Sequence, residues 1–133
     1  MEQIEFLILK NLLHNEKYLR KALPFIKGEY FQDSNQKIVF EEISTFVEEY
    51  NNIPTKEILI IEIEKRNDIN EDSFKEVTHL VGCLDDSPVE FEWLIDTTEK
   101  WCRDRAIYLA LLDSIAIADG KDEKKNPEAI PSI

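Results

Sequence analysis

The chain has few of the residues that build several common functional sites. Only three glycines occur among its 133 residues, and no Gly-x-x-x-x-Gly-Lys-Ser/Thr sequence is present, which excludes a phosphate-binding P-loop. The two cysteines, Cys83 and Cys102, have no Cys-x-x-Cys spacing and sit among apolar residues, so we expect reduced cysteines in the core. With two histidines and no nucleophile elbow, a catalytic triad is hard to assemble. We therefore expect no catalytic, cofactor-binding or metal-binding residues in this chain.

Clusters of basic residues are also missing. The 16 Lys and Arg residues are outnumbered by 28 Asp and Glu, which gives a net charge of −12, and no basic run exceeds two residues. Tight binding to DNA is disfavoured because phosphates would repel such a protein. No signal peptide pattern is present, and the apolar run that starts at Ala106 is short and interrupted by Asp113. We expect a soluble, cytoplasmic protein with no membrane partner.

What is present is apolar periodicity typical of helices, which predicts an all-α fold: a compact bundle of about six helices. The expected helices cover residues 2–14, 16–23, 34–50, 56–66, 71–84 and about 88–119. Asp33, Thr55 and Asn70 are predicted N-caps. Ser87 and Glu90 form a capping-box pattern that would begin the last helix at Pro88, with Gly120 as its C-terminal stop.

The last helix changes character halfway along. Residues 88–105 are amphipathic, whereas only Asp113 and Ser114 are polar among residues 106–118. A helix that is apolar on nearly all sides must be buried on more than one side, and little of the chain follows it. At 1.5 Å per residue the helix would be roughly 45 Å long, so its second half should project from a domain of this size. We therefore expect another polypeptide to cover this half.

The final residues differ in composition from the helical domain, which we predict to span residues 1–120. Residues 121–133 are charged, contain two prolines and read as a linker. Asn126 and Pro127 would begin a further helix that is cut short, which suggests a fragment of a longer protein.

Two residue patterns suggest chemical sites but have simpler explanations. Glu76 and His79 have the Glu-x-x-His spacing of di-metal helical bundles, but such sites need a second pair and two more glutamates. Adjacent carboxylates such as Glu41 and Glu42 do not converge on one pocket, so a charged surface is the better interpretation.

Several short motifs occur in a characteristic order. An acidic-aromatic pair precedes a helix with an apolar-Phe-x-x-Ile core, a turn leads into the next helix, and an Asp-Ser-Pro segment leads into a long helix with Thr-Glu-Lys and Arg-Asp-Arg. These motifs are Glu29-Tyr30-Phe31-Gln32-Asp33, Val39-Phe40-Glu41-Glu42-Ile43, Ile53-Pro54-Thr55, Asp86-Ser87-Pro88, Thr98-Glu99-Lys100, Arg103-Asp104-Arg105 and Ala129-Ile130-Pro131. Over residues 7–105, and more loosely to 133, the chain resembles the N-terminal domain of DnaB-type replicative DNA helicases, most closely those of T-even-like phages.

The resemblance implies a non-catalytic collar domain above a hexameric ring of ATP-dependent motor domains. ATP and Mg²⁺ would belong to the motor domain, which is absent from this chain. The partners would be further copies of the chain, primase and possibly a helicase loader, in the cytoplasm of a bacterial host. The last helix would be one arm of a helical hairpin. Its self-association residues would be Ile107, Leu111, Leu112, Ile115 and Ala118, which we call the seam.

Two other classes of protein remain as alternatives to a helicase collar domain. An independent acidic helical protein could inhibit a nucleic-acid enzyme by presenting carboxylates in place of phosphates, as the charge of −12 suggests. A di-metal enzyme would depend on Glu76 and His79 alone.

Overall fold

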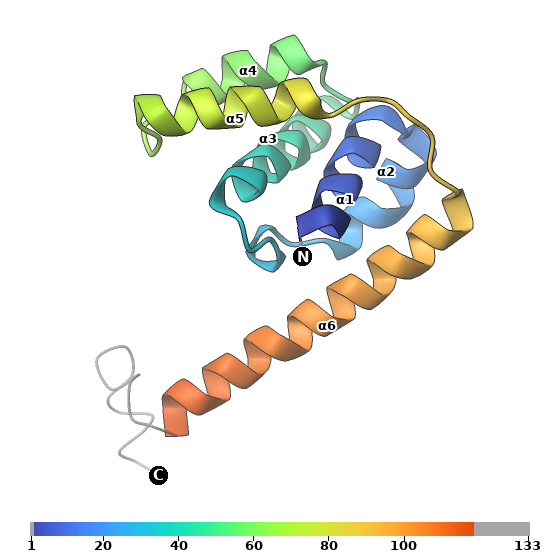
Figure 1. Cartoon of the computed structure of the whole chain (residues 1–133), viewed down its shortest axis with the longest axis vertical. Helices are drawn as coiled ribbons and strands as arrows, with labels where there is room; N and C mark the ends of the chain where they lie inside the picture. Colours follow the sequence, from blue (N-terminus) through green and yellow to red (C-terminus); the bar gives the residue numbers. More distant parts are fainter. Residues whose placement is uncertain (1, 119–133) are drawn as a thin grey trace. The chain divides into compact units, whose positions relative to one another are not determined.

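The computed structural model describes residues 2–118, which form six α-helices and two short 3₁₀ helices, with no strand in this range (Figure 1). The predicted all-α class and the number of helices are confirmed. The elements are α1 (Glu2–His14), α2 (Glu16–Ala22), η1 (Leu23–Phe25), η2 (Gly28–Tyr30), α3 (Ser34–Tyr50), α4 (Lys56–Glu64), α5 (Glu71–Cys83) and α6 (Phe91–Ala118).

Contacts group the described residues into two units, one that ends at Thr98 and one that starts at Glu99, so α6 contributes to both. In the first unit α3 contacts α1, α4 and α5, and Figure 1 shows α4 and α5 running side by side. The core of this unit is mainly aliphatic and comes from every α-helix. Its fully buried side chains include Ile8, Leu9, Leu12, Leu19, Val39, Ile43, Leu59, Ile63, Val77, Val81, Leu84 and Leu94.

Short polar side chains begin the helices where the sequence predicted them. The side chain of Asp33 accepts a hydrogen bond from the backbone N–H of Gln36 at 3.0 Å, and Thr55 and Asn70 cap α4 and α5 in the same way. These bonds satisfy N–H groups that have no partner inside the helix. At the other end of α3, Asn51 adopts a left-handed conformation with φ of 54°, which stops the helix.

The start of α6 differs from the predicted one. The helix begins at Phe91 rather than Pro88, and the cap is the side chain of Glu90, which accepts from the N–H of Trp93 at 2.7 Å. Ser87 does not cap this helix: its hydroxyl accepts from the ammonium of Lys10 and donates to Asp85 at 2.7 Å. The capping box at Ser87 was therefore wrong, since a tertiary cluster holds the hydroxyl that the local motif required.

Burial differs between neighbours along the helices and corrects one prediction. Ile8 is fully buried whereas Leu7 is half-buried, and Tyr50 at the end of α3 is 62% exposed. Cys83 is exposed and Cys102 is only half-buried, so the prediction of core cysteines was wrong for Cys83.

Some expectations fall on residues that the structure does not describe. Gly120, the linker at residues 121–133 and the helix start at Asn126 all lie outside residues 2–118, so the domain boundary at 120 stays a prediction. Among the described helices, none has the length and apolarity needed to cross a membrane.

Candidate interaction surface

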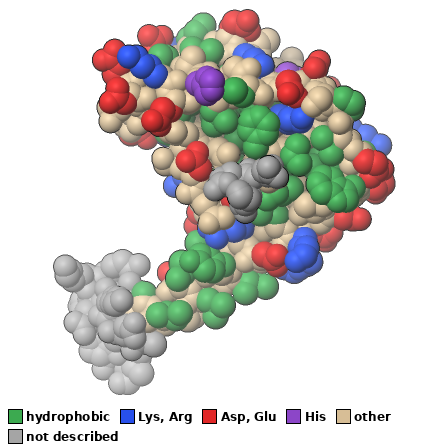
Figure 2. All heavy atoms as spheres, in the orientation of Figure 1, with side chains coloured by type: hydrophobic (Ala, Val, Ile, Leu, Met, Phe, Trp, Pro, Cys, Tyr) green, Lys and Arg blue, Asp and Glu red, His purple; other side chains and the backbone are tan. Residues whose placement is uncertain are grey.

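Helix α6 presents two environments to its side chains. In its first turns Leu94, Thr98 and Trp101 are buried, with exposed fractions of 0%, 4% and 8%. From Ala106 onward most large apolar side chains are exposed, as Figure 2 shows along this part of the helix, and Leu109 is half-buried. The exposed side chains are Ile107, Tyr108, Leu111, Leu112, Ile115 and Ile117, each 44–56% exposed.

Four predicted seam residues share one side of the helix. With about 100° per residue, Ile107, Leu111, Ile115 and Leu112 fall within an arc of about 140°. All four are exposed, and Asp113 projects about 100° beyond the end of this arc. The fifth seam residue, Ala118, falls in the same arc by its position, but its side chain is outside the described set. The chain therefore has a continuous apolar surface on one side of α6.

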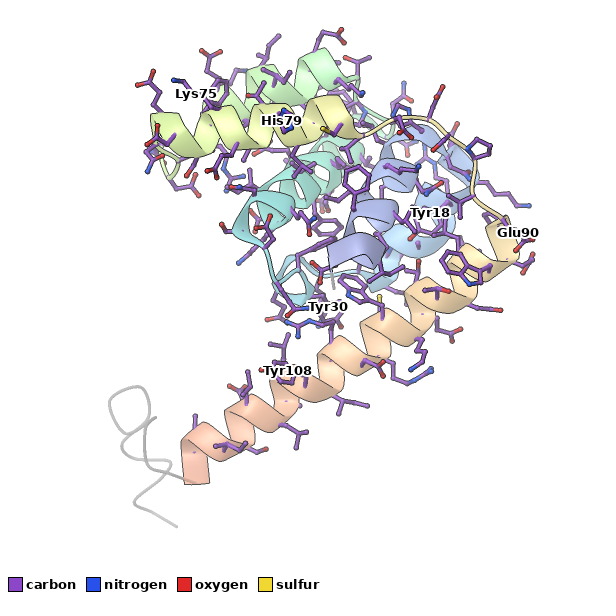
Figure 3. All side chains as sticks on the ribbon, in the orientation of Figure 1. Tyr18, Tyr30, Lys75, His79, Glu90 and Tyr108 are labelled. Carbon is purple, nitrogen blue, oxygen red and sulfur yellow. The ribbon has the colours of Figure 1, made fainter. Side chains whose placement is uncertain are left out.

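Tyr108 belongs to the same surface and was not predicted. Measured around the helix axis from Ile107, it lies at about 100°, between Ile115 and Leu112, and it is 51% exposed. The guanidinium of Arg105 lies over its ring, 5.1 Å from the centroid (Tyr108 is labelled in Figure 3). Its position on the wheel was readable from the sequence. An aromatic ring with a polar tip is common at protein interfaces.

Helix α2 holds the first turns of α6. The hydroxyl groups of Tyr18 and Thr98, both buried, form a hydrogen bond of 2.6 Å, although 80 positions separate them in the chain. The ammonium group of Lys17 lies 4.5 Å from the ring centroid of Phe91, at cation–π distance. These contacts fix the part of α6 that belongs to the first unit.

Helix α1 holds the connection that leads from α5 to α6. The buried side chain of Lys10 donates to Asp85 at 3.0 Å and also to the hydroxyl of Ser87. One turn further along α1, His14 Nε2 lies 2.8 Å from the carbonyl oxygen of Leu84. Hydrogen bonds from Ser87 and the ammonium of Lys10 hold the pKa of the Asp85 carboxyl well below its ordinary value. The irregular segment before α6 is thus tied to the centre of the first unit.

Adjacent carboxylates turn out to have a shared partner. Arg66 donates to Glu42 at 2.8 Å, to Glu41 at 3.1 Å and to Asp68 at 2.9 Å. The hydrogen bond to Asp68 is the main cause that raises the pKa of the Arg66 guanidinium above its ordinary value, and bonds to the two glutamates add to it. The sequence interpretation of Glu41 and Glu42 as a solvated surface missed this ion-pair cluster between α3 and the end of α4.

The Glu-x-x-His pair does not form the centre of a larger ligand cluster. Glu76 Oε1 accepts from the side-chain amide of Asn35 at 2.9 Å, which joins α5 to α3. Within residues 2–118 no group of three or more His, Cys, Asp or Glu side chains has an arrangement that could hold a metal ion.

Together these features define a small all-α domain whose last helix carries an uncovered apolar surface. No protein-family model matches the chain. Comparison with known proteins finds 32% identity over 135 residues to the "DnaB-like replicative helicase" of Enterobacteria phage T4. The aligned region covers 96% of this chain and 28% of that protein, so the chain spans less than a third of its relative's length. The predicted resemblance to DnaB-type helicases of T-even-like phages is confirmed, and the similarity supports a helicase-related domain.

Proposed function

We propose that the chain is the N-terminal collar domain of a phage replicative DNA helicase, and that it associates with further copies through the seam on α6. The observation that carries the proposal is the apolar surface from Ile107 to Ile115 on a helix of an otherwise well-packed domain. Exposed apolar patches of this kind are typical of interaction sites. The similarity to a phage helicase over nearly the whole chain supports the same conclusion.

The charge distribution favours apolar pairing between copies. Two molecules that each carry −12 repel one another, so an interface between them must exclude carboxylates. The seam meets this requirement because its described members are aliphatic and Asp113 projects away from them. Packing against an identical helix would bury the seam of both copies.

The magnitude of this burial implies weak pairing. Full burial of a Leu or Ile side chain contributes about 1.5–3 kcal/mol, and the described seam residues are about half exposed, so eight side chains in a pair contribute about 6–12 kcal/mol. Loss of translational and rotational freedom costs about 4–15 kcal/mol. Gains in the upper part of this range exceed costs in the lower part by a few kcal/mol, so two isolated seams pair weakly, at about millimolar concentration. A stable ring needs contacts from neighbouring segments as well.

The remaining roles follow from membership of such a ring. The domain would dock primase, and possibly a loader, while ATP and Mg²⁺ would act at a motor domain outside this chain. The protein would work in the cytoplasm of the bacterial host.

The seam is tested by sedimentation of the chain carrying Leu111→Asp and Ile115→Asp. We expect the unaltered chain to associate as its concentration rises, and the double variant to stay monomeric, because pairing would bury two carboxylates from each copy. Ile117→Asp is the matched control, since Ile117 is 44% exposed but lies about 80° outside the seam. A double variant that folds and associates like the unaltered chain would refute the seam. An unaltered chain that remains monomeric at about 1 mM, where even weak pairs form, would refute self-association.

A further inference from the structure

A thiol and an imidazole meet on the surface of α5, away from the features described so far. Cys83 and His79 are one helical turn apart, and Cys83 Sγ lies 3.6 Å from His79 Nε2. Both side chains are exposed, and Figure 3 labels His79 on this helix. Residues four apart on a helix share a face, so the backbone itself holds the two groups together.

The separation of the two atoms suits a tetrahedral metal ion. Zinc binds thiolate sulfur at about 2.3 Å and imidazole nitrogen at about 2.0–2.1 Å, so at the tetrahedral angle the two ligand atoms lie about 3.6 Å apart. The observed distance between Sγ and Nε2 is 3.6 Å. A zinc ion could therefore bridge Cys83 and His79 without a change in the helix or in the spacing of the two side chains.

The surroundings also suit a cation. Cys83 is the last residue of α5, and the dipole at a helix C-terminus favours positive charge. Lys56 already uses this preference, since its ammonium donates to the carbonyl oxygen of Gly82 at 3.2 Å. Both side chains are exposed to solvent, and a methyl group built on the intervening Gly82 would meet no atom of more distant residues within 4 Å. Water ligands of a bound ion would have room there.

We propose that His79 and Cys83 form a two-ligand site for a thiophilic divalent cation of the Zn²⁺ type. On binding, the Cys83 thiol releases its proton to solvent, a sulfur–metal bond forms, and water leaves the hydrated ion. In residues 2–118 no third His, Cys, Asp or Glu joins the pair, so water completes the coordination and the ion stays exchangeable. The sequence interpretation considered His79 with Glu76 and missed its partner one turn later. The proposal is independent of the helicase similarity and of the seam.

The site is tested by titrating the reduced chain with Cd²⁺, a zinc substitute, and following the ultraviolet charge-transfer band of the metal–thiolate bond. We expect the band to saturate at one equivalent and to disappear in Cys83→Ser. His79→Gln should weaken binding by at least about tenfold, because even loss of an outer-sphere partner costs about 10–100-fold. Cys102→Ser is the matched control and should bind as the unaltered chain does.

A second measurement separates binding to folded α5 from binding to a free thiol. Because the pair is assembled only in the helix, Zn²⁺ should raise the Tm of the unaltered chain but not that of His79→Gln. Both residues are exposed, so the variants should keep their helical far-ultraviolet spectrum. Absence of the band, or a band of equal affinity in His79→Gln, would overturn the proposal and leave only a hydrogen bond between thiol and imidazole.

Discussion

The hydrogen bond between Tyr18 and Thr98 allows a sharp test of how α6 is held by the first unit. The two hydroxyl groups lie 2.6 Å apart, and the side chains are 0% and 4% exposed. Tyr18→Phe removes one hydroxyl and leaves that of Thr98 buried without this partner. Such a loss costs about 1–3 kcal/mol, because the remaining group has been taken out of water. Thr98→Val should destabilise the fold by a similar amount for the same reason.

The double variant distinguishes this explanation from simple loss of packing. Replacing both partners with apolar groups of the same shape is close to neutral, so Tyr18→Phe with Thr98→Val should cost less than the two single changes together. We expect a coupling free energy of at least about 1 kcal/mol. Urea unfolding followed by circular dichroism measures each free energy of unfolding, and an unchanged m-value would show that the compactness of the end states is preserved. A double variant whose cost equals the sum of the singles would refute the bond as the link between α2 and α6.

Two further predictions follow from the pKa shifts. The hydrogen bond from Arg66 is the main cause that lowers the pKa of Asp68 below 3.8, so this pair stabilises the fold above that pH and its contribution fades as the pH falls through the lowered pKa. Arg66→Gln should therefore be less stable than the unaltered chain at neutral pH and lose less further stability as the pH falls. Lys65→Gln affects only an exposed ion pair and should behave as the unaltered chain. Equal profiles of stability against pH for all three proteins would contradict this. Burial raises the pKa of the Cys102 thiol from 9.0 to about 11. At neutral pH its thiolate fraction is therefore about a hundredfold lower than that of a thiol with the ordinary pKa. A chromogenic disulfide should thus label the exposed Cys83 well before Cys102. Labelling at equal rates would show that Cys102 is accessible.

Features set by neighbours in the chain were predictable from the sequence. The N-caps Asp33, Thr55 and Asn70 each bond to an N–H three residues away, so residue type and position suffice to predict them. The same holds for the apolar side of α6, because helical periodicity alone places Ile107 and Leu111 on one side. That this side is a self-association seam stays a prediction.

Features set by distant parts of the chain were not predictable in this way. A capping box at Ser87 fits the local pattern, but Lys10, 77 positions earlier, and the neighbouring Asp85 engage the hydroxyl, so α6 begins only at Phe91. From the sequence Glu41 and Glu42 are predicted to be solvated charges, but in the folded chain Arg66 donates hydrogen bonds to both.

The sequence by itself determined the all-α class, most helix boundaries and the apolar half of α6, because those depend on interactions within one or two helical turns. Only the tertiary structure decided where α6 begins, which carboxylates are paired, and that Cys83 faces solvent beside His79. The physical reason is that hydrogen bonds and burial between residues up to 80 positions apart compete with local preferences, as the bond from Lys10 to the Ser87 hydroxyl does.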